Sequence, residues 1–123
     1  MMKNLKVAAA LGFGLAAVLV ADPASAQVKI GAVLSASGPA SFLGDPEKKT
    51  LDIYFEDINA KGGIDGQKLQ LVVYDDGGDA NAARTFATRL VEEDKVVAMV
   101  GGTTTGSTLA MIPLFEDAQI PFI

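Results

Sequence analysis

A loop of small hydroxyl-bearing residues is the segment whose composition best suits ligand binding. The apolar run over residues 96–100 ends at a glycine pair, and residues 101–108 read Gly-Gly-Thr-Thr-Thr-Gly-Ser-Thr. This order is typical of a buried parallel strand that turns into the start of a helix. The start of a helix presents unpaired backbone N–H groups and a partial positive charge, which favour a carboxylate or a phosphate. The candidate anion-binding groups are the hydroxyl and N–H groups of Thr104, Thr105, Gly106 and Ser107.

The glycine spacing of this loop is that of a nucleotide-binding P-loop, but the rest of that motif is missing. Gly101 and Gly106 stand at the required separation, whereas Ser107 occupies the position that requires lysine. Without this lysine, the β- and γ-phosphates of a nucleotide would lack their main counter-charge. A single carboxylate, as in an amino acid, suits the loop better. A structural alternative also stays open, in which Thr105 only caps the following helix.

The composition excludes several other kinds of site. The sequence contains no histidine and no cysteine, which removes soft-metal sites, disulfides and most nucleophile–base pairs. We therefore expect no enzyme activity, no metal and no cofactor. The formal net charge is −5 and there is no basic stripe, which argues against nucleic acid as a partner. Asp75, Asp76 and Asp79 lack the spacing of a helix–loop–helix calcium site, so we interpret them as a turn and a helix cap.

The first 26 residues have the organisation of a secretory signal peptide. Lys3 and Lys6 precede the apolar run over residues 7–20, and Ala24-Ser25-Ala26 supplies the small residues of a cleavage site. A retained membrane anchor is the alternative, but the apolar run is shorter than a bilayer requires. We expect cleavage after Ala26 and a soluble product outside the cytoplasm, formed by residues 27–123.

Hydrophobic periodicity and turn residues predict alternating strands and helices after the cleavage site. The first helix should begin at Pro46 with Asp45 as its cap and end at Gly62. Asp79 should cap the second helix, and Pro113 should kink the third helix or delay its start. The expected strands cover residues 28–34, 69–74, 96–100 and 120–123. The expected buried faces are Leu51, Tyr54, Phe55 and Ile58 in the first helix, and Ala83, Phe86, Ala87, Leu90 and Val91 in the second.

This alternation predicts an α/β fold with a parallel, doubly wound sheet and helices on both of its faces. Ligands of such sheets bind at the carboxyl ends of the strands, where the strand order reverses. The loops over residues 35–44 and 101–107 should both lie at that edge. Phe42 and Leu43 stand in the first loop, either to contact a ligand or to anchor the loop. The last strand has no helix after it, so we expect the sheet to be incomplete at the C-terminus.

Several short motifs follow one another in an order and spacing that resemble a known family. They are Ser37-Gly38-Pro39, Ile58-Asn59-Ala60-Lys61-Gly62-Gly63-Ile64, Tyr74-Asp75-Asp76, the loop over residues 100–108, and Phe115-Glu116-Asp117. With them, residues 28–123 resemble the opening of the periplasmic branched-chain amino-acid-binding proteins, the leucine-binding-protein-like type I solute-binding proteins of ABC transporters. The resemblance implies a periplasmic location and a full chain several-fold longer. Residues 27–123 would form the N-terminal part of the Rossmann-like first lobe of a two-lobed protein.

The resemblance also implies roles for individual residues. At the position of Thr105 the family uses a serine or threonine to hold the ligand's α-carboxylate, with help from neighbouring backbone N–H groups. Residues that match Thr103, Thr104 and Leu43 line the pocket for the ligand's side chain. In leucine-specific members these three positions are apolar or aromatic, whereas two of them are threonine here. Related subfamilies bind other amino acids, amides and carboxylates.

These observations together predict a substrate-binding component of an ABC importer. It would capture a small carboxylate-bearing solute, such as a branched-chain or related amino acid, without chemical conversion. Its partners would be this ligand and the transporter's membrane permease, and the full-length protein would be a monomer. The alternative function is a ligand-sensing ectodomain of a receptor or regulator that uses the same lobes.

Overall fold

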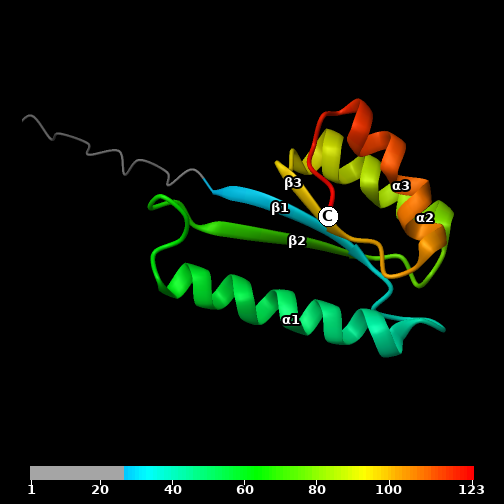
Figure 1. Cartoon of the computed structure of the whole chain (residues 1–123), viewed down its shortest axis with the longest axis horizontal. Coiled ribbons are helices and arrows are strands. Elements are labelled where there is room, and N and C mark those ends of the chain that lie inside the picture. Colours follow the sequence, from blue (N-terminus) through cyan, green and yellow to red (C-terminus); the bar gives the residue numbers. More distant parts are fainter. Residues whose placement is uncertain (1–26) are drawn as a thin grey trace, which may run out of the picture.

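The computed structural model describes residues 27–123, which form alternating strands and helices (Figure 1). In chain order the elements are β1 (Val28–Leu34), α1 (Ser41–Ala60), β2 (Leu69–Asp75), α2 (Ala80–Arg89), the π-helical turn η1 (Leu90–Asp94), β3 (Ala98–Gly101) and α3 (Thr105–Asp117). The predicted signal peptide, residues 1–26, lies outside the described residues. Among the helices of residues 27–123, none has the length and apolar character needed to cross a bilayer.

The three strands form a parallel sheet in the order β2-β1-β3. Val28 of β1 lies opposite Leu69 of β2, and Ile30 lies opposite Ala98 of β3. The chain thus moves from β1 to a neighbour on one side and then returns to a neighbour on the other side. This arrangement confirms the predicted doubly wound sheet, and its strand order reverses between β1 and β3.

The predicted fourth strand over residues 120–123 is present as a short pairing with β3. Residues 121–123 lie parallel to β3, where the N–H of Met99 donates to the Pro121 carbonyl (2.8 Å) and the N–H of Ile123 donates to the Met99 carbonyl (3.0 Å). A single bridge joins Met99 to Phe122. The prediction of a strand over residues 120–123 was therefore right in direction and place but too long.

Helices cover the sheet unequally: α1 lies on one face, and α2 and α3 lie together on the other (Figure 1). The face beneath α2 and α3 carries the main hydrophobic core. Its fully buried side chains include Leu90, Met99, Met111 and Phe115. Gly31 leaves the space that Leu90 fills, since a Cβ there would lie 2.9 Å from a Leu90 methyl carbon.

The first helix begins earlier than the sequence suggested. α1 starts at Ser41 with Ala40 at the cap position and no side-chain cap, so the prediction of a cap at Asp45 was wrong. A glycine makes the early start possible, because a Cβ on Gly44 would lie 2.1 Å from the Ser35 carbonyl oxygen. Pro46 is consequently inside the helix, where its missing N–H removes one intrahelical hydrogen bond.

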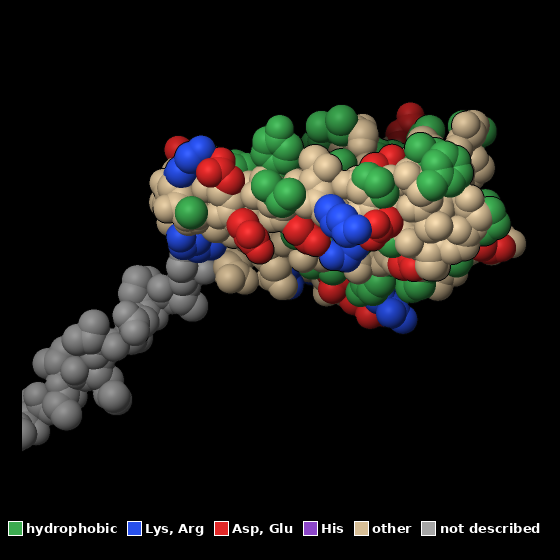
Figure 2. All heavy atoms as spheres, turned by 90° about the horizontal axis from the view of Figure 1, so that it is seen from below, with side chains coloured by type: hydrophobic (Ala, Val, Ile, Leu, Met, Phe, Trp, Pro, Cys, Tyr) green, Lys and Arg blue, Asp and Glu red, His purple; other side chains and the backbone are tan. Residues whose placement is uncertain are grey.

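The expected buried stripe of α1 is only partly buried. Leu51, Phe55 and Ile58 are half-buried, but Tyr54 is 62% exposed, so its assignment to the core was wrong. The reason is geometric, since α1 has the sheet on one side but no extensive packing against another helix of the described residues. Figure 2, a view from the α1 side, shows hydrophobic side chains at the surface between acidic and basic ones.

The second and third helices follow the predictions more closely. Asp79 caps α2, because its Oδ1 accepts a hydrogen bond from the N–H of Ala82 (2.8 Å). The predicted buried face of α2 packs into the core. The strand β3 begins at Ala98 rather than Val96, and α3 starts at Thr105 and runs through Pro113. The proline therefore does not delay the start of α3.

Candidate functional site

The two loops expected at the carboxyl edge of the sheet meet through hydrogen bonds. The backbone N–H of Ser35, just after β1, donates to Oγ1 of Thr103, just after β3 (2.9 Å). The same hydroxyl donates to Oε2 of Glu47 on α1 (2.6 Å). The turn after β3 is thus attached to both β1 and α1. These contacts lie between β1 and β3, where the strand order reverses and ligands of such sheets bind.

Two glycines allow the tight turn after β3. Gly101 and Gly102 both have positive φ angles, +115° and +90°, a region that side chains disfavour. A Cβ on Gly102 would also lie 2.1 Å from Oγ1 of Thr108. That hydroxyl lies within hydrogen-bonding distance of the Gly102 carbonyl (3.0 Å) and the Thr104 carbonyl (2.9 Å). The turn therefore folds back closely on the first turn of α3.

Thr104, not Thr105, is the cap of α3. Its Oγ1 accepts from the N–H of Ser107 (3.3 Å) and donates to Oγ of Ser107 (2.9 Å). Ser107 is fully buried, and its N–H and its hydroxyl both contact the Thr104 hydroxyl. The alternative in which Thr105 only caps the helix is wrong for this reason.

The start of α3 leaves two N–H groups and one hydroxyl at the surface. Thr105 and Gly106 are exposed, and their N–H groups make no hydrogen bond within residues 27–123. A Cβ on Gly106 would have no atom within 4 Å, which indicates open space in front of it. Because the helix dipole places partial positive charge here, these groups can bind a carboxylate.

Leu43 stands at the same edge of the sheet but not in a loop. It belongs to the first turn of α1, where it is 46% exposed, and the adjacent Phe42 is more exposed still. The contact of Gly44 with Ser35 fixes this turn of α1 against the end of β1. The sequence thus placed Leu43 at the correct edge but assigned it to the wrong element.

Two aspartates hold the loop after β1 against the turn after β2. Oδ1 of the buried Asp76 accepts from the hydroxyl of Ser35 (2.7 Å), and Asp75 Oδ1 accepts from the N–H groups of Ser37 (3.1 Å) and Gly77 (3.0 Å). Partial burial raises the pKa of Asp75, but these hydrogen bonds outweigh it and hold the pKa below its ordinary value of 3.8. The sequence marked both residues as a turn and gave no sign of these long-range contacts.

The described residues show no group of acidic side chains arranged to hold a metal ion. Asp76 has one carboxylate oxygen, Oδ2, that is buried without a hydrogen-bond partner in this part of the chain. Its other oxygen is engaged with Ser35 and with the N–H of Gly78 (2.8 Å). This geometry is that of a structural carboxylate between two loops.

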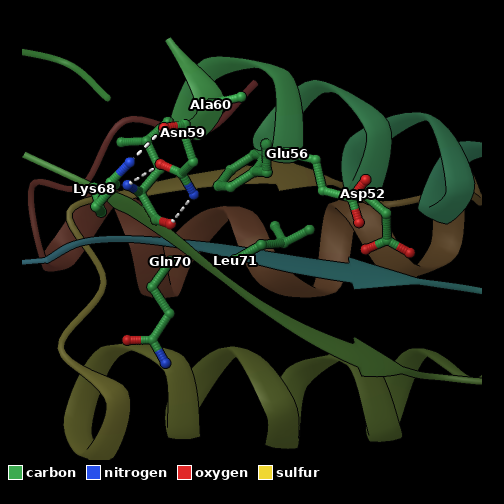
Figure 3. A pocket seen from close by; sticks show the side chains of 9 residues that line it. Asp52, Glu56, Asn59, Ala60, Lys68, Gln70 and Leu71 are labelled. Atoms are coloured by element: carbon green, nitrogen blue, oxygen red, sulfur yellow. Dashed lines mark hydrogen bonds between the residues drawn. The ribbon is translucent and has the colours of Figure 1, made fainter. Parts of the chain in front are cut away.

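Two hollows flank α1, and only one of them is near the site. A cavity of about 560 Å³ lies beside the turn after β3 and is lined by Glu47, Leu51, Val100 and Gly102, among others. A second hollow of about 710 Å³ lies between α1 and the first residues of β2, at the opposite end of the sheet (Figure 3). The second one is remote from the loops that form the candidate site.

Figure 3 also shows the structural role of Asn59, which belongs to the sequence motif over residues 58–64. The side-chain amide of Asn59 faces the start of β2, where Nδ2 donates to the Leu69 carbonyl (2.8 Å) and Oδ1 accepts from the Leu69 N–H (2.7 Å). The amide thus pairs with the edge strand as another strand would. Asn59 holds the end of α1 against β2.

Comparison with known proteins gives one consistent family. The family described as "Periplasmic binding protein" matches residues 27–123. The chain is 36% identical over 121 residues to the Leu/Ile/Val-binding protein of Escherichia coli (strain K12), which covers 98% of this chain and 32% of that protein. It is 39% identical over 102 residues to Leu/Ile/Val-binding protein homolog 7 of Brucella abortus (strain 2308), with 83% of this chain and 25% of that one covered.

A solved structure gives the same result for the fold. The branched-chain amino acid transporter substrate binding protein LivJ from Streptococcus pneumoniae, in complex with isoleucine, superposes with a TM-score of 0.76. It is 34% identical, and the match covers 78% of this chain and 28% of that chain. The predicted type I fold and the predicted family resemblance are both confirmed. The chain spans about a quarter to a third of the length of these relatives.

Proposed function

The chain belongs to the periplasmic binding protein family, and on that premise we propose that it is part of a substrate-binding component of an ABC importer. It captures a small carboxylate-bearing solute, an amino acid of branched-chain or related type. The named relatives are a Leu/Ile/Val-binding protein and a homolog of such proteins, which supports both the ligand class and a role without chemical conversion. Its partners are the solute and a membrane permease, and its compartment is the periplasm.

The observation that carries this proposal is the open start of α3. The N–H groups of Thr105 and Gly106 and the hydroxyl of Thr105 stand at the positive end of a helix dipole, at the carboxyl edge of the sheet. In the proposal they hold the ligand's carboxylate. Ser107 supports this site from beneath through its contact with Thr104.

Two threonines at the site, Thr103 and Thr104, make hydrogen bonds within the protein that affect which ligand side chains they can accommodate. The Thr103 hydroxyl donates to Glu47 and the Thr104 hydroxyl donates to Ser107. The Thr103 proton is thus used by the Glu47 carboxylate, and the Thr104 hydroxyl is already paired with Ser107. Threonine at these positions is therefore compatible with an aliphatic ligand, and Leu43 adds an apolar group at the same edge.

Ligand binding can be tested in a two-lobed protein that carries this segment. Residues 27–123 replace the matching part of the Escherichia coli Leu/Ile/Val-binding protein, and isothermal titration follows binding of L-leucine, L-isoleucine and a panel of other amino acids. We expect saturable binding with a negative heat-capacity change, as closure buries apolar surface. The proposal fails if the hybrid is folded and binds no member of the panel while the parent protein binds leucine.

The role of Thr105 needs its own variant in the same hybrid. Thr105→Ala should weaken binding by roughly tenfold or more, since a hydrogen bond to a charged group contributes about 1.5–3 kcal/mol. Thr85→Ala is the matched control, because Thr85 is exposed on α2 and its hydroxyl bonds only to the Asn81 carbonyl (3.0 Å). Equal affinities of the two variants would remove the Thr105 hydroxyl from the site.

The proposed export can be tested on the chain itself. Expression in a Gram-negative host should yield a periplasmic product whose mass corresponds to an N-terminus at Gln27. A product that keeps residues 1–26 in the membrane fraction would instead indicate a retained anchor.

A further inference from the structure

We propose that Glu47 and Thr103 form a positioning pair that fixes the turn after β3, and with it the start of α3, against α1. The inference rests on the proposed function, because it concerns the groups that would hold the ligand's carboxylate. It assigns Thr103 a role different from lining the ligand pocket, and it gives Glu47 a role where the sequence suggested none.

The hydrogen-bond geometry supports this pair directly. The hydroxyl of Thr103 donates to Oε2 of Glu47 at 2.6 Å and accepts from the N–H of Ser35 at 2.9 Å. One side chain therefore joins α1, the end of β1 and the turn after β3. Among residues 27–123, this is the one hydrogen bond that connects α1 to residues 101–107.

The Glu47–Thr103 contact acts at a turn that glycines make conformationally adaptable. It stands beside the backbone hydrogen bonds from the N–H of Gly101 to the Ile123 carbonyl (2.8 Å) and from the N–H of Gly102 to the Val33 carbonyl (3.1 Å). Gly101 and Gly102 precede Thr103, and glycine has more accessible backbone conformations than any other residue. The cap residue Thr104 follows directly, and then the exposed N–H groups of Thr105 and Gly106. A displacement of Thr103 would therefore move the anion-binding groups within two or three residues of it.

Glu47 could act in another way, and the two roles predict different binding behaviour. A carboxylate near a site for an amino acid could contact the ligand's ammonium group directly. A direct contact would affect amino acids but not acetate, which has no ammonium group. A positioning role affects both, because the carboxylate-binding groups themselves are displaced.

The test uses the ¹⁵N-labelled chain and its amide NMR spectrum without ligand. Thr103→Val removes the hydroxyl at nearly constant shape, Thr103→Ser keeps it, and Glu47→Ala removes the acceptor. We expect Thr103→Val and Glu47→Ala to shift the same amide signals, those of Ser35, Thr105 and Gly106, and the double variant to resemble either single one. Thr103→Ser should resemble the wild type. Glu56→Ala, at an exposed position of the same helix, should leave these signals unchanged.

A titration with sodium acetate measures the effect on binding. The Thr105 and Gly106 amides of the wild type should shift and saturate, and Thr103→Val and Glu47→Ala should each raise the dissociation constant by about three- to tenfold. If the wild type gives no response to acetate, the carboxylate site of the proposed function fails, and the ligand-free spectra still decide the positioning role. Unchanged Thr105 and Gly106 signals in Glu47→Ala, or additive effects in the double variant, would overturn the inference.

In the hybrid with the Escherichia coli protein, L-leucine titration completes the comparison. A loss of leucine affinity in Glu47→Ala, combined with unchanged acetate binding in the chain, would replace positioning by direct contact with the ammonium group. Parallel losses for both ligands, reversed by Thr103→Ser relative to Thr103→Val, are the expected result.

Discussion

The two faces of the sheet are held in different ways. On one face, α2 and α3 pack against the sheet and each other around buried side chains such as Met111 and Phe115. Phe115 also packs against Phe122, with ring centroids 5.3 Å apart. On the other face, α1 is the one helix against the sheet among the described residues, its apolar side chains are half-buried or exposed, and a cavity remains beside β3.

What holds α1 is a small set of specific contacts. Gly44 packs on the Ser35 carbonyl, Asn59 pairs with Leu69, and Glu47 accepts from Thr103. Hydrophobic burial therefore stabilises the α2–α3 face, whereas close backbone approach and polar contacts fix the position of α1. The candidate site lies where the two arrangements meet, between the first turns of α1 and α3.

The largest expected effect is the loss of the core beneath α2 and α3. Phe115→Ala should lower the free energy of unfolding by about 3–5 kcal/mol, since it removes a fully buried ring. Tyr54→Ala on the α1 face should cost less than about 1 kcal/mol. Urea unfolding followed by circular dichroism measures both. Where Phe115→Ala no longer folds, Phe115→Leu gives the smaller loss. Equal losses at positions 54 and 115 would refute the contrast between the faces.

A smaller effect is expected where α1 meets β1. Gly44→Ala places a Cβ 2.1 Å from the Ser35 carbonyl oxygen, so the start of α1 must shift, at a cost of about 1–3 kcal/mol. Gly106→Ala has open space around its new Cβ and should stabilise the chain by about 0.5 kcal/mol. Thermal unfolding of the two variants measures the difference. A neutral Gly44→Ala would show that the close approach is not required.

The polar contact at the other end of α1 should contribute about 1–2 kcal/mol. Asn59→Ala removes two half-buried hydrogen bonds to the backbone of Leu69. Asn81→Ala, at an exposed position in α2, is the matched control. Amide hydrogen exchange at Leu69 should accelerate in the first variant and not in the second. Unchanged protection at Leu69 would mean that α1 is held by packing alone.

The smallest expected effect is a dependence of stability on pH through Asp75. Its pKa is lower in the folded chain than its ordinary value, because Ser37 and Gly77 donate to the carboxylate. The stabilisation is therefore complete above pH 3.8 and is lost as the pH falls through the lower, folded-state pKa. The urea midpoint should fall between pH 6 and pH 3 by less in Asp75→Asn than in the wild type. Identical slopes would contradict this role.

The sequence was sufficient where the determining interactions are local. Asp79 caps α2 through a residue three positions away, and β1 was predicted with the bounds that the structure has. The start of α1 was mispredicted because it depends on Gly44 meeting Ser35 across a loop. Pro46 suggested a helix start by local rules, and the longer-range contact prevailed.

The sequence predicted where the candidate site lies but not the role of each threonine, because only the first depends on local signals. The glycine pair and the hydroxyl residues identified the turn after β3, but three adjacent threonines offer equivalent local signals. Their different environments come from partners far along the chain or on the buried side of α3: Glu47 for Thr103, and Ser107 for Thr104. No periodic pattern in the sequence predicts a hydrogen bond between residues 56 positions apart.

Ser35 combines contacts that make its neighbourhood interdependent. Its N–H donates to Thr103 and its hydroxyl donates to Asp76. Its carbonyl oxygen lies so close to Gly44 that a side chain there would clash with it. Mutations at these four positions should therefore show epistasis, because the cost of each change depends on which residues occupy the other three. In sequence space, the loops around the candidate site form one coupled unit, in which a substitution at one position changes which substitutions are tolerated at the others.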